Sequence, residues 1–516
     1  MNPHFITKTS ALALICAAGP AFADVTPQEV WDDMVKSYGA FGIEVEGQTS
    51  EDGATLTAED IVFRVTIPEK MTDEDETATF ELTSTGWQFV DNGDGTVSIV
   101  LPETTPVGMR GTDKTGEAFN VSMELTGENQ EYLVSGDPDN MTTEYSADRL
   151  TVKVIEAMAE GEAVSDLDMV YNMHDVATRT VSTVREMREI EYESSVASTD
   201  YTMDMVFPEQ PKEDGSGPVE GSGGVMKASG KYGATVMSAS GSVPADGFTQ
   251  DFSNTISSGT NGSLTATLAD VSQTTEVMES GQPLEYTTAY ESAEMEARIG
   301  EDGLHYGGTG TGMRIDVTAA QVPFPINFAA ETFGFDALVP LLKSEEEQDY
   351  ELGLELRDLT VNDEIWSMFD PQAQLPRDPA TVSVNISGAL TLMQNLAESF
   401  ESDTPPGLPN SLSLNELHIS LAGASLTGEG GVTFDNEDMQ TYPGLPKPVG
   451  EASFELTGSN TLLDTLVGMG LVPEAQAMQG RMMVGMFAAQ TGDDTLTSKL
   501  EFTEDGHVLA NGQRVK

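Results

Sequence analysis

Apolar and polar residues alternate along most of this chain, and that alternation restricts its fold more than any other feature. From Ile43 onward apolar residues recur at every second position, for example over residues 61–67 and 190–207. This period places successive side chains on opposite faces of a strand. No crossover helices separate the runs, so the strands are expected to pair antiparallel. The sequence therefore predicts a β-dominated α+β protein built from extended antiparallel meander sheets.

Turn signals between the runs predict how the strands connect. Residues 87–90 and 96–101 flank the motif Asp91-Asn92-Gly93-Asp94-Gly95. This motif lacks the alternating oxygen ligands of an EF-hand calcium loop, so it predicts a hairpin turn. The glycine-rich residues 307–312 precede no helix start, which a phosphate-binding loop needs. They predict a flexible strand or a bulge.

The first helix is predicted over residues 27–39. Thr26 is placed to cap it, Pro27 suits its first position, and Glu29 completes a capping box. Gly39 is placed to end it. Other helices are expected only in the last third of the chain.

Residues 1–23 have the order of features of a secretory signal peptide. A polar lead containing Lys8 is followed by the apolar run at residues 11–18 and by Ala21-Phe22-Ala23, a small-x-small cleavage pattern. Cleavage is expected after Ala23, and the mature chain is expected in the periplasm, with an extracellular location as the alternative. No later run approaches the ~18 apolar residues of a membrane-spanning helix, so no span is expected after cleavage.

Composition excludes several kinds of function. Cys16 is the only cysteine and lies in the expected signal peptide, so the mature chain is expected to have no disulfide, thiol nucleophile or cysteine metal ligand. The formal net charge is −62, which disfavours nucleic acid as a partner. No motif for a cofactor is present, and none is expected.

Composition and pattern divide the chain into regions. Residues 24–208 are expected to hold the first helix and an antiparallel β region, and residues 225–347 a second β region. Between them, residues 209–224 are rich in glycine and proline and predict a linker or long loop. Residues 348–516 are expected to form a C-terminal α+β region.

The C-terminal region contains an internal repeat, over residues 375–434 and 445–510. Leu375-Pro376-Arg377 recurs seventy positions later as Leu445-Pro446-Lys447, and Gly388 recurs as Gly458. Each copy predicts a loop, a strand, a break at the glycine, an amphipathic helix and a hairpin. The second copy has a longer helical section, residues 473–490. Two such units are expected to share a core.

Three segments resemble an uncharacterised family of exported alphaproteobacterial proteins, catalogued as domain of unknown function 2125. They are residues 23–27 with Trp31, residues 375–380 and residues 503–512. The resemblance extends over nearly the whole chain after residue 23, and implies export but no particular activity. More remotely, the strand–glycine–helix units resemble large β-rich envelope proteins of the AsmA type, which implies lipid handling.

The residues that could perform chemistry are scattered. The histidines of the expected mature chain, which stand singly and not at zinc-site spacing, are His174, His305, His418 and His507. No nucleophile elbow of the G-x-S-x-G type occurs. We therefore predict no catalytic residues, no metal site and no enzymatic activity.

Methionines in the last third are the most suggestive feature for binding. Methionine provides adaptable apolar surface, suited to acyl chains or partner helices, but it also fills cores. A speculative ligand groove is predicted from a group of six apolar residues, namely Met469, Met478, Met482, Met483, Met486 and Phe487.

Three classes of function remain open on the sequence alone. The first is non-enzymatic binding of a lipid or another apolar ligand in a groove of curved sheet covered by the C-terminal helices. The second is a structural or protein-interaction role in the cell envelope, and the third is a hydrolase with a hidden site. A continuous apolar groove favours the first class, an exposed flat strand edge the second, and a deep polar pocket with shifted pKa values the third.

Overall fold

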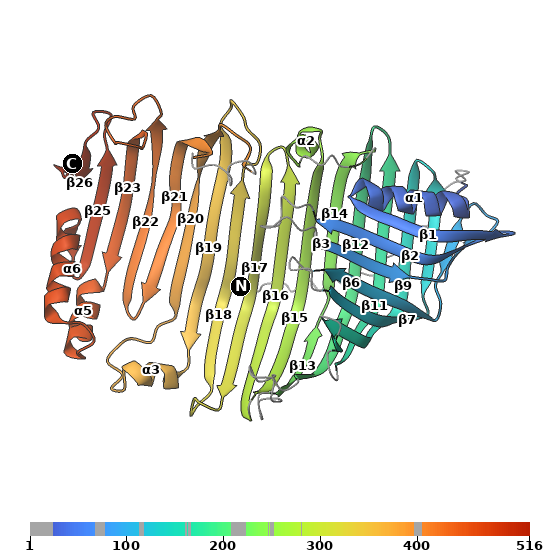
Figure 1. The fold of residues 1–516 in the computed structure, drawn as a ribbon. Helices are drawn as coiled ribbons and strands as arrows, with labels where there is room; N and C mark the ends of the chain where they lie inside the picture. The colour runs from blue at the N-terminus through green and yellow to red at the C-terminus, as the bar shows by residue number, and fades with distance from the viewer. Residues whose placement is uncertain are drawn as a thin grey trace, which may run out of the picture.

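The computed structural model describes residues 24–67, 78–112, 118–159, 162–163, 167–207, 223–245, 247, 252–279, 281–396 and 405–516. In these ranges the strands belong to one large antiparallel sheet, with few helices beside it (Figure 1). The predicted β-dominated meander is confirmed. The expected signal peptide and most of the expected linker at residues 209–224 lie outside the described residues.

The strands follow one another across the sheet almost in chain order. Those before the long loop are β1 (Ile43–Asp52), β2 (Thr55–Ile67), β3 (Ala78–Ser84), β4 (Trp87–Asp91), β5 (Val97–Val100), β6 (Thr104–Thr112), β7 (Ala118–Glu128), β8 (Glu131–Asp137), β9 (Asn140–Ala159), β10 (Glu162–Ala163), β11 (Asp168–Val184) and β12 (Met187–Phe207). The predicted hairpin at residues 91–95 is confirmed, because β4 pairs with β5 around it.

The remaining strands continue the same pattern. They are β13 (Gly224–Tyr232), β14 (Thr235–Pro244), β15 (Asn261–Glu279), β16 (Gln282–Gly300), β17 (Gly303–Ala319), β18 (Ile326–Val339), β19 (Gln348–Val361), β20 (Ala380–Leu392), β21 (Gly407–Leu421), β22 (Ala424–Asp435), β23 (Lys447–Thr457), β24 (Ala489–Gly492), β25 (Thr495–Phe502), β26 (Val508–Ala510) and β27 (Gln513–Arg514). Pairing of β12 with β13, and of β18 with β19, carries the sheet across both expected region boundaries.

Helices lie at the ends of the sheet and along its margins. They are α1 (Pro27–Ala40), α2 (Phe252–Ser257), α3 (Asp363–Phe369), α5 (Ser459–Gly468) and α6 (Glu474–Phe487). The predicted first helix is confirmed, and Thr26 and Glu29 form the predicted capping box. Figure 1 shows α1 at one end of the sheet and α5 and α6 at the other.

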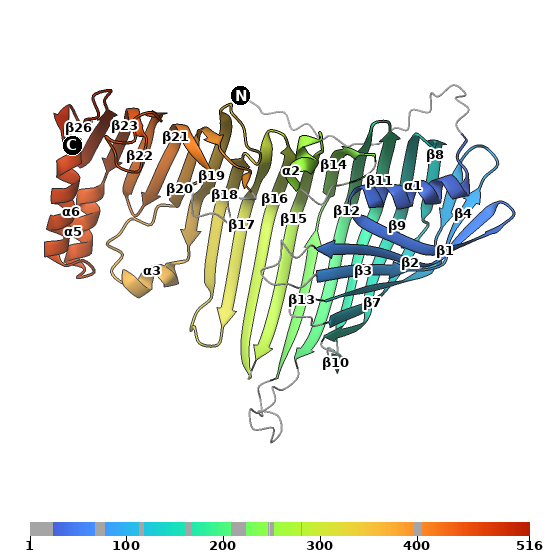
Figure 2. The same ribbon diagram turned by 45° about the horizontal axis from the view of Figure 1, so that its top comes forward.

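Left-handed residues interrupt the alternation in four strands of the sheet. Asp60, Asp175, Asp270 and Asp358 have φ of 49° to 53° and lie within β2, β11, β15 and β19. Two residues instead of one separate the inward-facing side chains there, as between Leu268 and Val271 of β15. Irregularities of this kind bend strands and increase sheet twist. They account for the curved shape of the sheet, which is hollow on one side (Figure 2).

The N-terminal strands fold over the rest of the sheet. Figures 1 and 2 show β1, β2 and β3 lying steeply across β11 and β12. β7 pairs with β9 and so connects these strands to the rest of the sheet. The main core of buried side chains lies at this end. It contains Trp31 of α1, which packs edge-on against Phe89 of β4, together with Leu56, Ile61 and Val134. α1 packs against β1, β2 and β4.

The two predicted repeats differ at their glycines. In the second copy β23 ends at Thr457, Gly458 adopts φ 69°, and α5 begins at Ser459, as predicted. In the first copy the predicted break at Gly388 is wrong, because β20 continues through it to Leu392. A Cβ on Gly388 would lie 2.2 Å from the carbonyl oxygen of Ser411, so this glycine allows close strand packing. The helix predicted after it lies largely outside the described residues.

Candidate apolar binding face

One face of the sheet is apolar across its width. Directly paired residues of an antiparallel sheet share a face. Phe335 of β18 pairs with Gly308 and with Leu354, and Leu354 pairs in turn with Val384. The same relation continues through Leu417 of β21 to strands β22 and β23. Period-two patterning therefore places the apolar residues of ten strands, β15 to β23 with β25, on one side.

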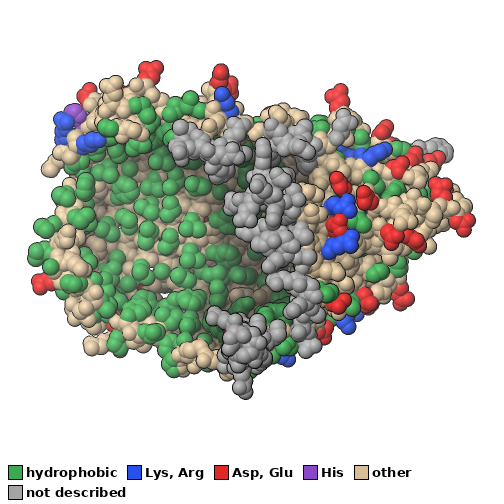
Figure 3. Space-filling model, viewed as in Figure 1, with side chains coloured by type: hydrophobic (Ala, Val, Ile, Leu, Met, Phe, Trp, Pro, Cys, Tyr) green, Lys and Arg blue, Asp and Glu red, His purple; other side chains and the backbone are tan. Residues whose placement is uncertain are grey.

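Many of these inward-facing side chains are open to solvent. Figure 3 shows them as a broad hydrophobic hollow over the middle and C-terminal strands. Ten large ones, with exposed fractions between 37% and 57%, are Met295, Leu304, Tyr306, Phe335, Leu352, Leu354, Val382, Leu412, Ile419 and Leu421. Soluble proteins rarely leave so large an apolar patch without a binding role. We call this surface the inner face.

The opposite face is polar and carries charged pairs between neighbouring strands. Arg357 on β19 binds Glu416 on β21 at 3.0 Å, and His305 on β17 binds Asp336 on β18 at 2.7 Å. His174 lies on the same face and binds Asp200 at 2.8 Å. These pairs cross-link neighbouring strands on the outside. The carboxylates of these three pairs therefore lie on the side away from the inner face.

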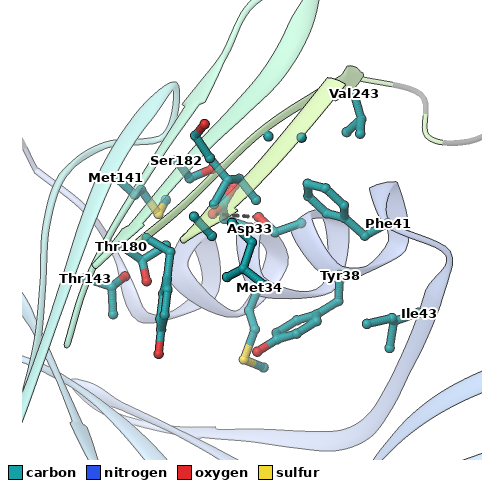
Figure 4. A pocket seen from close by; sticks show the side chains of 18 of the residues that line it. Asp33, Met34, Tyr38, Phe41, Ile43, Met141, Thr143, Thr180, Ser182 and Val243 are labelled. Atoms are coloured by element: carbon teal, nitrogen blue, oxygen red, sulfur yellow. Dashed lines mark hydrogen bonds between the residues drawn. The ribbon is translucent and has the colours of Figure 1, made fainter. Parts of the chain in front are cut away.

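The hollow leads into a cavity beside α1. Its volume is about 740 Å³, which is in the range of sites for small molecules and cofactors. Figure 4 shows Met34, Tyr38 and Phe41 approaching it from α1 and its end, and Met141, Thr143 and Ser182 from strands β9 and β11. Ile299 and Leu304 of the inner face line it too, so the cavity and the inner face are continuous.

The cavity wall is largely apolar, and it includes two tyrosines with raised pKa values. Burial raises the pKa of Tyr132, which lines it, to about 12, and neighbouring tyrosines add to the effect. Burial also raises the pKa of Tyr38 above its usual value. Both phenols therefore stay uncharged near neutral pH. Such a wall suits an apolar ligand with few polar groups.

A buried ion pair fixes α1 at the cavity. Arg188 of β12 is 3% exposed, and its Nη1 donates to Asp33 of α1 at 2.7 Å. The same nitrogen donates to the hydroxyls of Ser37 at 2.6 Å and Ser182 at 2.8 Å. The guanidinium thus links α1 to two strands of the sheet. Asp33, Ser37 and Ser182 also line the cavity.

Five of the six residues of the predicted groove lie on α6, and the sixth, Met469, follows α5. Met469 packs against the small cluster of Trp366, Leu375 and Ala422. The others lie on α6 and are exposed, with fractions from 45% for Phe487 to 63% for Met486. None of the six lines the cavity beside α1. The cavity and inner face were missed because they combine single residues from α1 and many strands, which leaves no local motif.

Few groups suited to catalysis come together. Among the described residues, no three His, Cys, Asp or Glu side chains are placed to hold a metal ion. The four histidines predicted to stand singly are each on a strand or, for His507, beside β26.

No helix in the described ranges is long and apolar enough to cross a membrane.

The fold and its inner face define a class, namely an open, single-sheet β protein with one apolar concave surface. Residues 262–514 match the model of a family described as an uncharacterized protein conserved in bacteria, DUF2125. No curated protein and no solved structure matches the chain. The matched part begins in β15 and ends in β27, so it contains the exposed part of the inner face and excludes α1. The resemblance noted at residues 375–380 and 503–512 lies within the match, and that at residues 23–27 lies outside it.

Proposed function

We propose that this chain is an exported, non-enzymatic lipid-binding protein that holds acyl chains against its inner face. The observation that carries the proposal is the continuity of exposed apolar side chains from the cavity beside α1 to the strands at the C-terminal end. Contact with water is unfavourable for this surface, and an acyl chain would cover it. The periplasm is the expected compartment, because the features of residues 1–23 indicate secretion.

The size of the face fits acyl chains. Neighbouring strands lie about 4.8 Å apart, so the ten strands β15 to β23 and β25 extend roughly 40 Å. One leaflet of a bilayer's hydrocarbon core is about 15 Å thick, so an extended acyl chain has ample room. Each methylene removed from water contributes about 0.8 kcal/mol. A chain of ordinary length would therefore bind through apolar contact alone.

The open edge of β1 gives less support to the alternative, a protein-interaction role, than the inner face gives to lipid binding. β1 pairs only with β2 among the described strands, so its other edge is open. Glu44, Glu46, Glu51 and Asp52 lie along it. Charged residues on an edge strand oppose pairing with another chain. The hydrolase alternative is favoured by no side-chain arrangement in the described residues.

The test expresses the full chain in a bacterium, purifies the exported protein from the periplasm without detergent, and identifies the bound lipids by mass spectrometry. We expect stoichiometric phospholipid or fatty acid, and an intact protein mass that matches residues 24–516. The double variant Leu352→Asp/Leu354→Asp introduces two charges at inward positions that are 51% and 57% exposed, where little packing is lost. It should lose most of the lipid.

A matched variant separates the inner face from charge alone. Ser453 is exposed on the outer face of β23, beside Lys499, between the inward residues Ala452 and Phe454. Ser453→Asp should keep the full lipid content. A folded wild-type protein free of lipid, or equal loss in both variants, would overturn the proposal.

A further inference from the structure

Helix α6 has its apolar side turned outward. Only Ala477 is buried in this helix. Met478, Met482 and Met486, four residues apart on one side, are 57%, 62% and 63% exposed, and Met483 beside them is 56% exposed. A helix on a globular protein normally turns its apolar side to the core. The reversed orientation of α6 therefore needs an explanation.

Polar contacts hold this orientation. Arg481, which flanks the methionines on α6, donates from Nε to the side-chain oxygen of Asn460 on α5 at 2.9 Å, and from Nη2 to Asp464 at 2.6 Å. At the end of α6 the carbonyl of Phe487 accepts from Ser498 at 2.8 Å and from Asn511 at 3.1 Å. α6 thus presents its methionines, which we call the methionine face, from a fixed position.

The two terminal helices carry little charge of their own. α5 and α6 contain two acidic residues and one basic residue, in a chain with a formal net charge of −62. The next acidic residue that contacts them, Asp494, accepts hydrogen bonds from the backbone at the start of α5. The basic residue, Arg481, is paired with the acidic Asp464. A strongly acidic protein is repelled from anionic lipid surfaces. Its two terminal helices are the part that can approach such a surface at low electrostatic cost.

We propose that the methionine face docks onto the surface of a lipid bilayer and inserts between its headgroups. This inference rests on the proposed lipid-binding function, because docking would bring the C-terminal end of the inner face to a source of lipid. α5 and α6 stand at that end of the sheet (Figure 1). Methionine is unbranched and flexible, so it packs well against disordered acyl chains. The one cation of α6, Arg481, is paired with Asp464, so binding occurs by apolar insertion.

The experiment is flotation of residues 24–516 with vesicles of phosphatidylethanolamine and a minority of phosphatidylglycerol. Met482→Gln/Met486→Gln removes apolar surface without adding charge and keeps helix propensity similar. We expect its vesicle partition coefficient to fall about tenfold or more. The matched variant Met482→Leu/Met486→Leu should partition like the wild type. Added salt should not weaken binding, because attraction between charges plays little part.

Several outcomes would overturn the proposal. Failure of the wild type to float with vesicles, or equal flotation of the glutamine variant, excludes insertion by this face. A concentration-dependent dimer in the absence of lipid, abolished by the glutamine variant, would identify a second copy as the occupant instead. Bound lipid is measured separately on the same preparations. If the protein carries lipid but does not float with vesicles, docking is contradicted and the proposed function is not. If lipid-free protein floats with vesicles, the proposed function is contradicted and docking is not.

Discussion

At the scale of single residues, the Arg188–Asp33 pair is a buried ionic contact that joins α1 to β12. Both side chains are largely buried, at 4% and 15% exposure, and they join elements 155 positions apart in the sequence. Removing one member of a buried ion pair leaves the other charge without a partner in a medium of low polarity. Removing both members of the pair can lower the free energy of unfolding far less.

The first prediction therefore concerns this pair. Arg188→Met and Asp33→Leu should each lower the free energy of unfolding by about 3–5 kcal/mol. The double variant should cost clearly less than the sum of the two, because no unpaired charge remains. Urea unfolding of all four proteins measures the coupling energy. Additive effects would show that the two charges do not depend on each other.

The alternation of apolar and polar residues predicted the strands but not the positions at which they bend. Alternation is visible in sequence, so the apolar positions of β15 on either side of Asp270 are recognisable. The change from even to odd inward positions is caused by the left-handed conformation at Asp270. Aspartate adopts that conformation more often than most residues do, yet it is also common in ordinary turns. The curvature that creates the cavity therefore could not be predicted from sequence.

The two repeat glycines illustrate the same limit. Gly388 and Gly458 occupy equivalent positions in the sequence pattern. Gly458 is left-handed and precedes a helix, whereas Gly388 lies within β20, with the ring of Tyr350 close to it. A glycine can serve either a turn or a close approach. Only the neighbouring strand, which a local pattern does not specify, decides between them.

At the scale of the element, glycines on the inner face allow aromatic rings to lie across the strands. A Cβ on Gly310 of β17 would lie 2.3 Å from the ring of Phe333 on β18. Phe333 also contacts Tyr290 of β16, with ring centroids 5.5 Å apart. The glycine-rich stretch of β17 is thus a strand, as predicted, and it makes room for these rings.

The second prediction compares two strand glycines. Gly310→Ala should lower the free energy of unfolding by about 1–3 kcal/mol, because Phe333 must move and strain its neighbours. A Cβ on Gly431, on the outer face of β22, would have Ser413 Oγ as its nearest neighbour at 3.4 Å, so the space there is sufficient. Gly431→Ala should be neutral or stabilising by up to about 1 kcal/mol. Thermal unfolding followed by circular dichroism distinguishes them, and equal shifts would contradict the role of Phe333.

The terminal helices show that the position of a helix can be predicted from sequence, whereas the direction its apolar side faces cannot. The sequence predicts a methionine-rich helix over residues 473–490, and α6 is found within this range. The periodicity of its methionines indicates one apolar side but not whether that side faces the sheet or the solvent. The orientation depends on Arg481, whose partners on α5 are 17 and 21 positions away.

At the scale of the whole molecule, buried apolar residues are distributed unevenly. The large core at the N-terminal end joins α1 to five strands, among them β2, β4 and β9. The buried cluster at the other end consists of Trp366, Leu375 and Ala422. Between them the strands contact mainly their neighbours, and one apolar side is open to solvent. Stability in such an arrangement resembles that of repeat proteins, where each unit depends on the next.

The last prediction follows from this distribution. Hydrogen exchange followed by mass spectrometry should show the strongest protection in β2, β4, β5, β8 and β9, and weaker protection in β16–β22, because local opening exposes fewer buried contacts there. Bound lipid stabilises the state that binds it. Adding lipid should therefore increase protection in β16–β22 and leave the N-terminal core nearly unchanged. Uniform protection without lipid would contradict the uneven distribution of stability, and a lipid effect confined to the N-terminal core would place the ligand in the cavity beside α1 alone.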